Sequence, residues 1–141
     1  MNHIQSPATD DSAIERDILA KGLTAPRVAP ADLSDNIANV IYFTADQGAY
    51  GAAEFSADSE VPVSGIAYIS PPALGLLTFC VLVLRNGFTV TGESACASPE
   101  NFDAEIGKKI AFENAKQKVW PLMGYALKQQ LHDIQNAKAP T

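Results

Sequence analysis

The side chains of this chain that could do chemistry are a few basic groups and a larger set of aromatic ones. The basic candidates, Arg27, Arg85, Lys108 and Lys109, could bind the phosphates of a small anion. Aromatic rings could stack on a base, because every base has a π-face. The aromatic candidates are Tyr42, Phe43, Phe88, Phe112, Trp120 and Tyr125. Each ring could instead belong to the core, and Lys109 could simply pair with Glu105 on a helix surface.

Residues typical of catalysis or metal binding are few and badly spaced. The two histidines, His3 and His132, stand far in the sequence from both cysteines, so no metal-ligand spacing is present. Ser94 and Cys96 have no histidine within local reach to activate them. The Gly107-Lys108-Lys109 run lacks the glycine-rich turn that cradles phosphate. The sequence therefore predicts a binding protein with no enzyme activity, no metal and no cofactor.

The charge of the chain argues against a nucleic-acid polymer as the ligand. The formal net charge is −6, whereas non-specific affinity for nucleic acid comes from a basic surface. Residues 1–75 hold 3 basic against 10 acidic residues, and residues 76–141 hold 7 against 6. An anionic ligand would have to bind at a local cluster of basic residues. Such a cluster suits a compact anion better than a polymer.

The element most clearly marked in the sequence is a β-hairpin at residues 76–97. Asn86-Gly87 between two apolar runs predicts a two-residue turn. In the register that such a turn sets, Val83 opposes Val90 and Cys80 opposes Glu93. Cys80 and Cys96 then lie on opposite faces of the sheet, which predicts two buried free thiols.

The first strand of this hairpin, residues 76–84, is apolar on both faces. A helix could cover one face, but the other then needs a partner subunit or the folded-back loop that precedes the hairpin. Exposed apolar surface there would favour aggregation. Oligomerisation is therefore the expected solution.

The remaining patterns predict a single α+β domain at residues 11–135. Short helices are expected at 11–21 and 31–40, and a long loop insertion at 46–75 with a short strand at 65–69. A long helix should start at Ser98 and run to about Trp120. It should bury Phe102, Ile106, Ile110 and Val119, with Ala111 and Ala115 allowing close approach. Pro121 should kink or restart it, giving a terminal amphipathic helix at 122–134. Disorder is expected at 1–10 and fraying at 136–141. With no signal peptide and no membrane span, the expected location is the cytosol.

Two strings of this sequence resemble a known family. They are RNGFTVTGESACASPENFDAEIGKKIAFENAKQKVWPLMGY and, nearer the start, KGLTAPRVAPADL. Both are similar to a family of small bacteriophage proteins, formerly of unknown function, that includes the first-described Thoeris anti-defence proteins. The resemblance covers roughly residues 20–125, apart from the loop at 46–75.

The resemblance implies a function and a set of ligand contacts. It implies a protein that sequesters host cyclic ADP-ribose isomers, and in some relatives CBASS cyclic trinucleotides, without cleaving them. It also implies a homodimer or a hexamer of dimers in the cytoplasm of the infected bacterial host. The implied ligand contacts are Arg27, Phe88, Lys108, Lys109 and Phe112. Arg85 and Tyr42 are secondary candidates.

This chain departs from the family pattern at three positions. Lys108 and Phe112 stand where many relatives have arginine, and Met123 stands where an acid is expected. Lysine does not reproduce the bidentate grip of a guanidinium on phosphate. The alternative function, from another class, is an interaction protein that binds a host or phage protein through its C-terminal helices.

Overall fold

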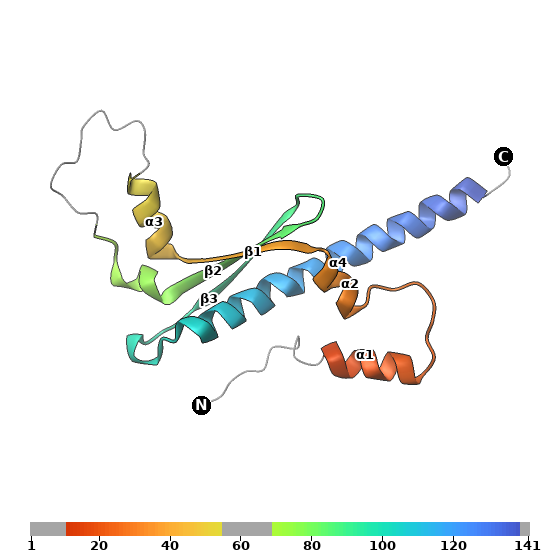
Figure 1. The fold of residues 1–141 in the computed structure, drawn as a ribbon, viewed down its shortest axis with the longest axis horizontal. Helices are drawn as coiled ribbons and strands as arrows, with labels where there is room; N and C mark the ends of the chain where they lie inside the picture. Colours follow the sequence, from red (N-terminus) through yellow and green to blue (C-terminus); the bar gives the residue numbers. More distant parts are fainter. Residues whose placement is uncertain (1–10, 55–68, 139–141) are drawn as a thin grey trace.

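The structure, a computed structural model, describes residues 11–54 and 69–138 and confirms an α+β architecture (Figure 1). A three-stranded antiparallel sheet of order β1-β2-β3 lies against one long helix. The α-helices are α1 (Asp11–Ala20), α2 (Pro30–Asp35), α3 (Ala45–Glu54) and α4 (Ala104–Lys138). The strands are β1 (Ile37–Thr44), β2 (Leu77–Leu84) and β3 (Thr89–Ala95), and the short 3-10 helices are η2 (Pro72–Leu76) and η3 (Pro99–Asn101).

The hairpin is present, but its predicted register is wrong by one residue. Leu82, not Val83, opposes Val90. The loop has three residues, because the Leu84 N–H donates to the Phe88 carbonyl (2.8 Å) and the Gly87 N–H donates back to the Leu84 carbonyl (2.9 Å). Gly87 has φ +88°, which is the left-handed residue that ends a three-residue hairpin loop.

The corrected register changes the reason that the two cysteines stay apart. Cys80 opposes Gly92, and the Cys96 N–H donates to the Leu76 carbonyl. Both cysteines therefore lie on the same face of the sheet, but about 13 Å apart along β2. Both are free thiols. Burial raises the pKa of the Cys80 thiol, whereas Cys96 is only half-buried.

Helix α4 packs against the sheet through its smallest residues. A Cβ on Gly92 of β3 would lie 2.2 Å from the Ala111 carbonyl oxygen and 2.3 Å from the Ala115 nitrogen. The buried residues of α4 are Gly107, Ala111, Ala115 and Val119. Of the predicted stripe only Val119 is buried. Ile106 is 45% exposed and Ile110 44% exposed, because the small residues take the face that approaches the sheet and push larger side chains to its flanks.

The limits of α4 also differ from the prediction. Ser98 starts only η3, and α4 begins at Ala104. Its cap is Asp103, whose Oδ1 accepts from the N–H groups of Glu105 (2.9 Å) and Ile106 (3.1 Å). The helix then continues through Pro121 to Lys138, so the two expected C-terminal helices are one. A proline removes one backbone hydrogen bond, and the many helix-forming residues around it keep the helix continuous.

The segment after α2 is a strand where the prediction extended a helix. Residues 37–40 belong to β1 and not to a helix over 31–40, since α2 ends at Asp35. The β-branched residues of β1 favour extended backbone. Leu33 of α2 is nevertheless fully buried, as expected.

The expected loop insertion contains a helix, α3, over its first residues. The signal was present in the sequence Thr44-Ala45-Asp46-Gln47, which is a capping box. The Thr44 N–H donates to Gln47 Oε1 (3.0 Å) and the Thr44 hydroxyl bonds Asp46 Oδ1. The strand predicted at 65–69 lies outside the described residues except for Ile69, which is in no strand. The predicted tail at 1–10 also lies outside them, whereas residues 136–138 belong to α4.

Candidate functional site

Four of the seven predicted ligand contacts fall into two separate places in the structure, and the other three lie elsewhere. Arg27 and Arg85 meet in one groove, and Tyr42 and Lys108 meet in a smaller hollow. The other three, Phe88, Lys109 and Phe112, lie outside both. The seven predicted ligand contacts therefore do not form a single site in the structure.

The first place, here called the arginine groove, has a volume of about 500 Å³. It lies between α2, the hairpin loop and the second half of α4, and Met123 and Leu127 of α4 line it. The hairpin loop is tied to the end of α2, because the Arg85 N–H donates to the Asn36 carbonyl (3.0 Å) and Arg85 Nε donates to the Asp35 carbonyl. These bonds bring Arg85 to the same groove as Arg27, 58 residues earlier in the chain.

Arg27 is held in one orientation by Glu15 of α1. The two guanidinium NH₂ groups donate to the two carboxylate oxygens at 2.7 and 2.6 Å. This pairing lowers the pKa of the Glu15 carboxyl and raises that of Arg27, with a smaller contribution from Asp32. A guanidinium has five N–H donors, so three remain for a ligand. Asp32 is occupied elsewhere, since its Oδ2 accepts from the Ala29 N–H at 2.8 Å.

The second place, the tyrosine hollow, has a volume of about 240 Å³ and lies near the start of α4. Lys108 Nζ stands 5.8 Å from the centre of the Tyr42 ring. It also lies 3.7 Å from Glu105 Oε1. Burial, with smaller contributions from Cys80 and Glu105, raises the pKa of the Tyr42 phenol, so the hydroxyl is a neutral donor. Thr78 lines this hollow and lies seven residues before Arg85, so the two places are about 23 Å apart along the hairpin strand.

The remaining three residues have separate surroundings. Phe88 is 53% exposed beside the hairpin loop, where its N–H donates to Asn86 Oδ1. Lys109 is exposed on α4. Phe112 is half-buried and packs against the core, which is the ordinary role of an aromatic residue. Neither the arginine groove nor the tyrosine hollow is lined by any of them.

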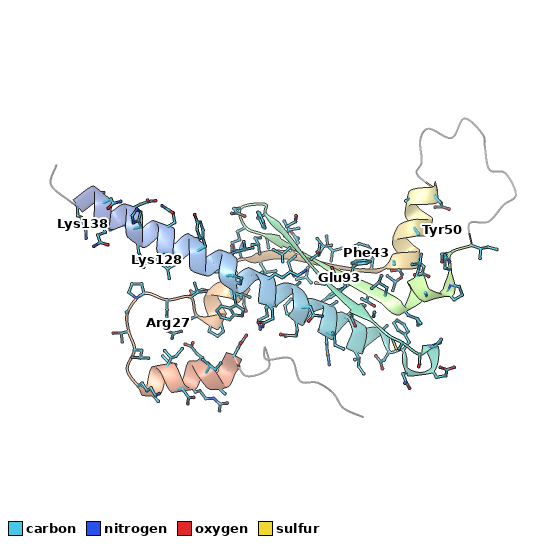
Figure 2. All side chains as sticks on the ribbon, turned by 180° about the vertical axis from the view of Figure 1, so that it is seen from behind. Arg27, Phe43, Tyr50, Glu93, Lys128 and Lys138 are labelled. Carbon is cyan, nitrogen blue, oxygen red and sulfur yellow. The ribbon has the colours of Figure 1, made fainter. Side chains whose placement is uncertain are left out.

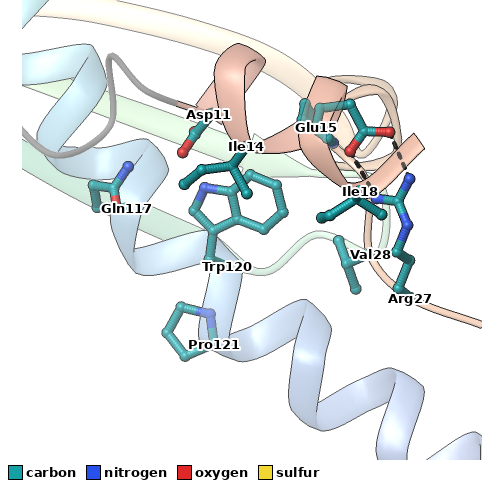
Figure 3. A pocket seen from close by; sticks show the side chains of 10 residues that line it. Asp11, Ile14, Glu15, Ile18, Arg27, Val28, Gln117, Trp120 and Pro121 are labelled. Carbon is teal, nitrogen blue, oxygen red and sulfur yellow. Dashed lines mark hydrogen bonds and ion pairs between the residues drawn. The ribbon is translucent and has the colours of Figure 1, made fainter. Parts of the chain in front are cut away.

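A third cavity, here called the indole pocket, lies between α1 and α4 and has a volume of about 440 Å³ (Figure 3). Trp120 lies between the side chains of α1 and those of Gln117 and Pro121 in this view. Arg27 and Val28 line both this pocket and the arginine groove, so the two are neighbours. Sequence reasoning named Trp120 as a ring that could stack but had no signal for the pocket, because its walls come from opposite ends of the chain.

Neither a metal site nor a membrane span is found in the described parts of the chain. No group of three or more His, Cys, Asp or Glu side chains among residues 11–54 and 69–138 could hold a metal ion. No helix in these ranges has the length and the apolar character needed to cross a bilayer.

Comparison with known proteins identifies the family. A family model described as phage protein (N4 Gp49/phage Sf6 gene 66) matches residues 28–131, well over half of the chain. The chain belongs to this family. The match includes the whole sheet and most of α4 but leaves α1 and Arg27 outside. Neither a curated protein nor a solved structure matches the chain.

Proposed function

We propose that this member of the phage family is an anti-defence protein that binds a host immune cyclic nucleotide and removes it from its effector. The first candidate ligand is a glycocyclic ADP-ribose isomer of Thoeris, and a cyclic trinucleotide of CBASS is the second. The proposal places the protein in the cytoplasm of the infected host. The observation that carries it is the arginine groove, where two guanidinium groups from distant parts of the chain line one cavity.

The groove has the size that a compact phosphate ester needs, and its two guanidinium groups line it together with the carboxylates of Asp32 and Asp35. Its volume of about 500 Å³ lies within the usual range for small-molecule sites. Arg27 offers its three remaining N–H donors in a fixed plane, and a guanidinium binds phosphate in a bidentate manner. Arg85 is exposed at the other wall. Capture without cleavage is the proposed mechanism.

The sheet supports the proposal that the protein acts as a homodimer, alone or within a hexamer of dimers. Helix α4 covers only one face of the sheet (Figure 1). The other face carries apolar side chains, with Ile41 51% exposed and Phe43 stacked on Phe79 at 5.5 Å between ring centres. A second copy placed on this face would bury the surface that would otherwise favour aggregation.

A substitution at the centre of the open face tests the dimer. Val81→Glu would place a carboxylate among apolar groups at the interface and is expected to convert the protein to a monomer. Light scattering after gel filtration measures the mass. Gln135→Glu, which adds the same charge on the exposed end of α4, is expected to leave the mass unchanged. A folded wild-type protein that is monomeric at micromolar concentration would overturn the dimer.

Capture is tested by binding and release. The protein is incubated with a glycocyclic ADP-ribose isomer, freed of unbound ligand and then denatured by heat. Intact nucleotide released into solution supports sequestration. Recovery of a cleaved product, or no binding of any cyclic nucleotide by calorimetry, overturns it.

A second candidate function, binding of a host or phage protein, is favoured by the projecting half of α4. Lys138, at the end of this half, stands clear of the sheet (Figure 2). The exposed apolar residues of this half of α4 are Leu122, Tyr125, Leu131 and Ile134. Leu127 is unsuitable for a test, because it lines the arginine groove. If Leu131→Glu with Ile134→Glu abolishes anti-defence activity in infected cells while Arg85→Ala leaves it intact, the protein-partner function is correct.

A further inference from the structure

We infer that the indole pocket binds a nucleobase, as the base half of a two-part nucleotide site whose phosphate half is the arginine groove. This inference rests on the proposed function for the phosphate half only. The base half stands on features of the indole pocket itself. These are the Trp120 ring with the aliphatic side chains around it, two buried polar atoms without a hydrogen bond, and the position of the pocket beside Arg27.

The lining of the indole pocket suits a flat ring. The Trp120 indole is half-buried, and Ile14, Ile18 and Pro121 form apolar walls around it (Figure 3). Stacking on an aromatic side chain is the usual way in which proteins hold an unpaired base. The space of about 440 Å³ is enough for a base with its sugar.

Two buried polar atoms in this pocket have no hydrogen-bond partner among the described residues. They are Asp11 Oδ2, an acceptor, and Gln117 Nε2, a donor. Lys116 Nζ lies 3.8 Å from Asp11 Oδ2, so the two form an ion pair without a hydrogen bond. Leaving buried polar atoms without a hydrogen bond is costly. The Watson–Crick edge of a base presents a donor beside an acceptor, so a base in the pocket could pair with both groups once the two side chains turn toward it.

The position of Arg27 links the two cavities. Arg27 and Val28 line both of them, and the Glu15 carboxylate fixes the guanidinium at their boundary (Figure 3). A nucleotide whose base stacks on Trp120 would thus extend its phosphates past Arg27 toward Arg85. One ligand would then use both cavities.

Helix α1 is held loosely enough to admit such a ligand. It has no buried residue, and Ile14 and Leu19 are exposed. Ion pairs tie it to the rest of the described chain, from Glu15 to Arg27 and from Asp11 to Lys116. A base inserted between α1 and α4 would cover Ile14 and complete the packing of the helix. Because the family match begins at residue 28, the α1 wall of this pocket lies outside the shared region.

Trp120 provides the measurement, since it is the one tryptophan in the sequence. Titration with a glycocyclic ADP-ribose isomer, and separately with adenosine, is expected to quench Trp120 emission in a saturable manner. Gln117→Leu, which removes the donor but keeps the size, is expected to weaken both ligands by about tenfold. Gln135→Leu, on the exposed end of the same helix, is the matched control and should leave both affinities unchanged.

Two results would overturn the base pocket and leave the proposed function intact. In the first, the cyclic nucleotide binds by calorimetry and depends on Arg85, but Trp120 emission does not change. In the second, Gln117→Leu binds as tightly as wild type. Should Gln117→Leu lose its helical circular dichroism, Gln117→Glu keeps the shape and replaces the donor, with the same tenfold loss expected. If no cyclic nucleotide binds, the proposed function fails, and the adenosine titration alone decides the base pocket.

Discussion

The two halves of helix α4 have different roles in the structure. Residues 104–119 lie on the sheet and contain all the buried residues of the helix, namely Gly107, Ala111, Ala115 and Val119. Residues 120–138 contain no buried residue, but Trp120, Met123 and Leu127 line the two neighbouring cavities. The first half therefore builds the fold, and the second half builds the candidate site.

The difference follows from side-chain size. In the first half, small residues repeat every four positions, so one face of the helix approaches β3 closely enough to contact the backbone at Gly92. In the second half the sheet has ended, and larger side chains project toward α1, α2 and the hairpin loop. In this chain the larger side chains of the second half line two cavities, whereas the small residues of the first half pack closely against Gly92.

The largest expected effect lies in the first half. Gly92→Ala would place a methyl group against the backbone of Ala111 and Ala115, which cannot move without shifting α4. We expect a loss of at least about 3 kcal/mol in the free energy of unfolding, measured by urea denaturation. Gln135→Ala, on the exposed end of α4, is the control and should change stability by no more than about 0.5 kcal/mol. Equal stability of the two variants would contradict the close packing.

The next effect compares the arginine groove with the tyrosine hollow. Arg85→Ala should weaken binding of a glycocyclic ADP-ribose isomer by about 10- to 100-fold, because a charge-assisted hydrogen bond to phosphate is lost. Lys108→Ala, in the tyrosine hollow, should weaken it by less than about threefold. Isothermal calorimetry gives both values, and Arg16→Ala on exposed α1 is the charge-matched control. A larger loss of affinity in Lys108→Ala than in Arg85→Ala would indicate that the ligand binds in the tyrosine hollow, beside the first half of α4.

Alanine substitutions at two glycines of α4 compare how tightly its two halves are packed, through their effects on protein stability. A Cβ on Gly124 would meet nothing within 4 Å, so Gly124→Ala should stabilise the protein by about 0.5 to 1 kcal/mol through helix propensity. A Cβ on Gly107 would lie 3.1 Å from the Thr78 hydroxyl oxygen, so Gly107→Ala should not give that gain. Thermal unfolding followed by circular dichroism measures both. A gain at Gly107 equal to that at Gly124 would show that the first half is less tightly packed than described.

The smallest effect is expected from acid, at the ion pair that holds α1. Because Arg27 lowers the pKa of the Glu15 carboxyl below its ordinary value of 4.5, the pair stabilises the folded chain fully above that value. Its contribution is lost as the pH falls through the lower folded value, and it is small for so exposed a pair. Trp120 emission should change below about pH 4.5. At pH 6, Glu15→Gln should already show the Trp120 emission that the wild-type protein shows in acid. Identical dependence of Trp120 emission on pH in the two proteins would exclude the Glu15–Arg27 pair as the group that holds α1.

Much of the fold was predictable because its signals are local. The hairpin, α1, the α+β class and the need to cover a doubly apolar β2 all follow from short patterns. The register was misjudged because a two-residue and a three-residue loop share the Asn-Gly signal, and only the Leu84 to Phe88 bond separates them. The buried face of α4 was predicted in part. Ala111 and Ala115 allow close approach as expected, but Ile106 and Ile110 are exposed and Gly107 is buried.

The sequence by itself determined which groups are present: two distant arginines, one tryptophan, two free thiols and a strand that needs covering on both faces. Only the tertiary structure decided which of them meet. It placed Arg27 and Arg85 on the walls of one groove and Trp120 beside α1, and it placed Tyr42 and Lys108 in a different cavity. The physical reason is that these meetings depend on contacts between segments far apart in the sequence. Examples are the bond from the Arg85 N–H to the Asn36 carbonyl and the packing of Ile14 near Trp120.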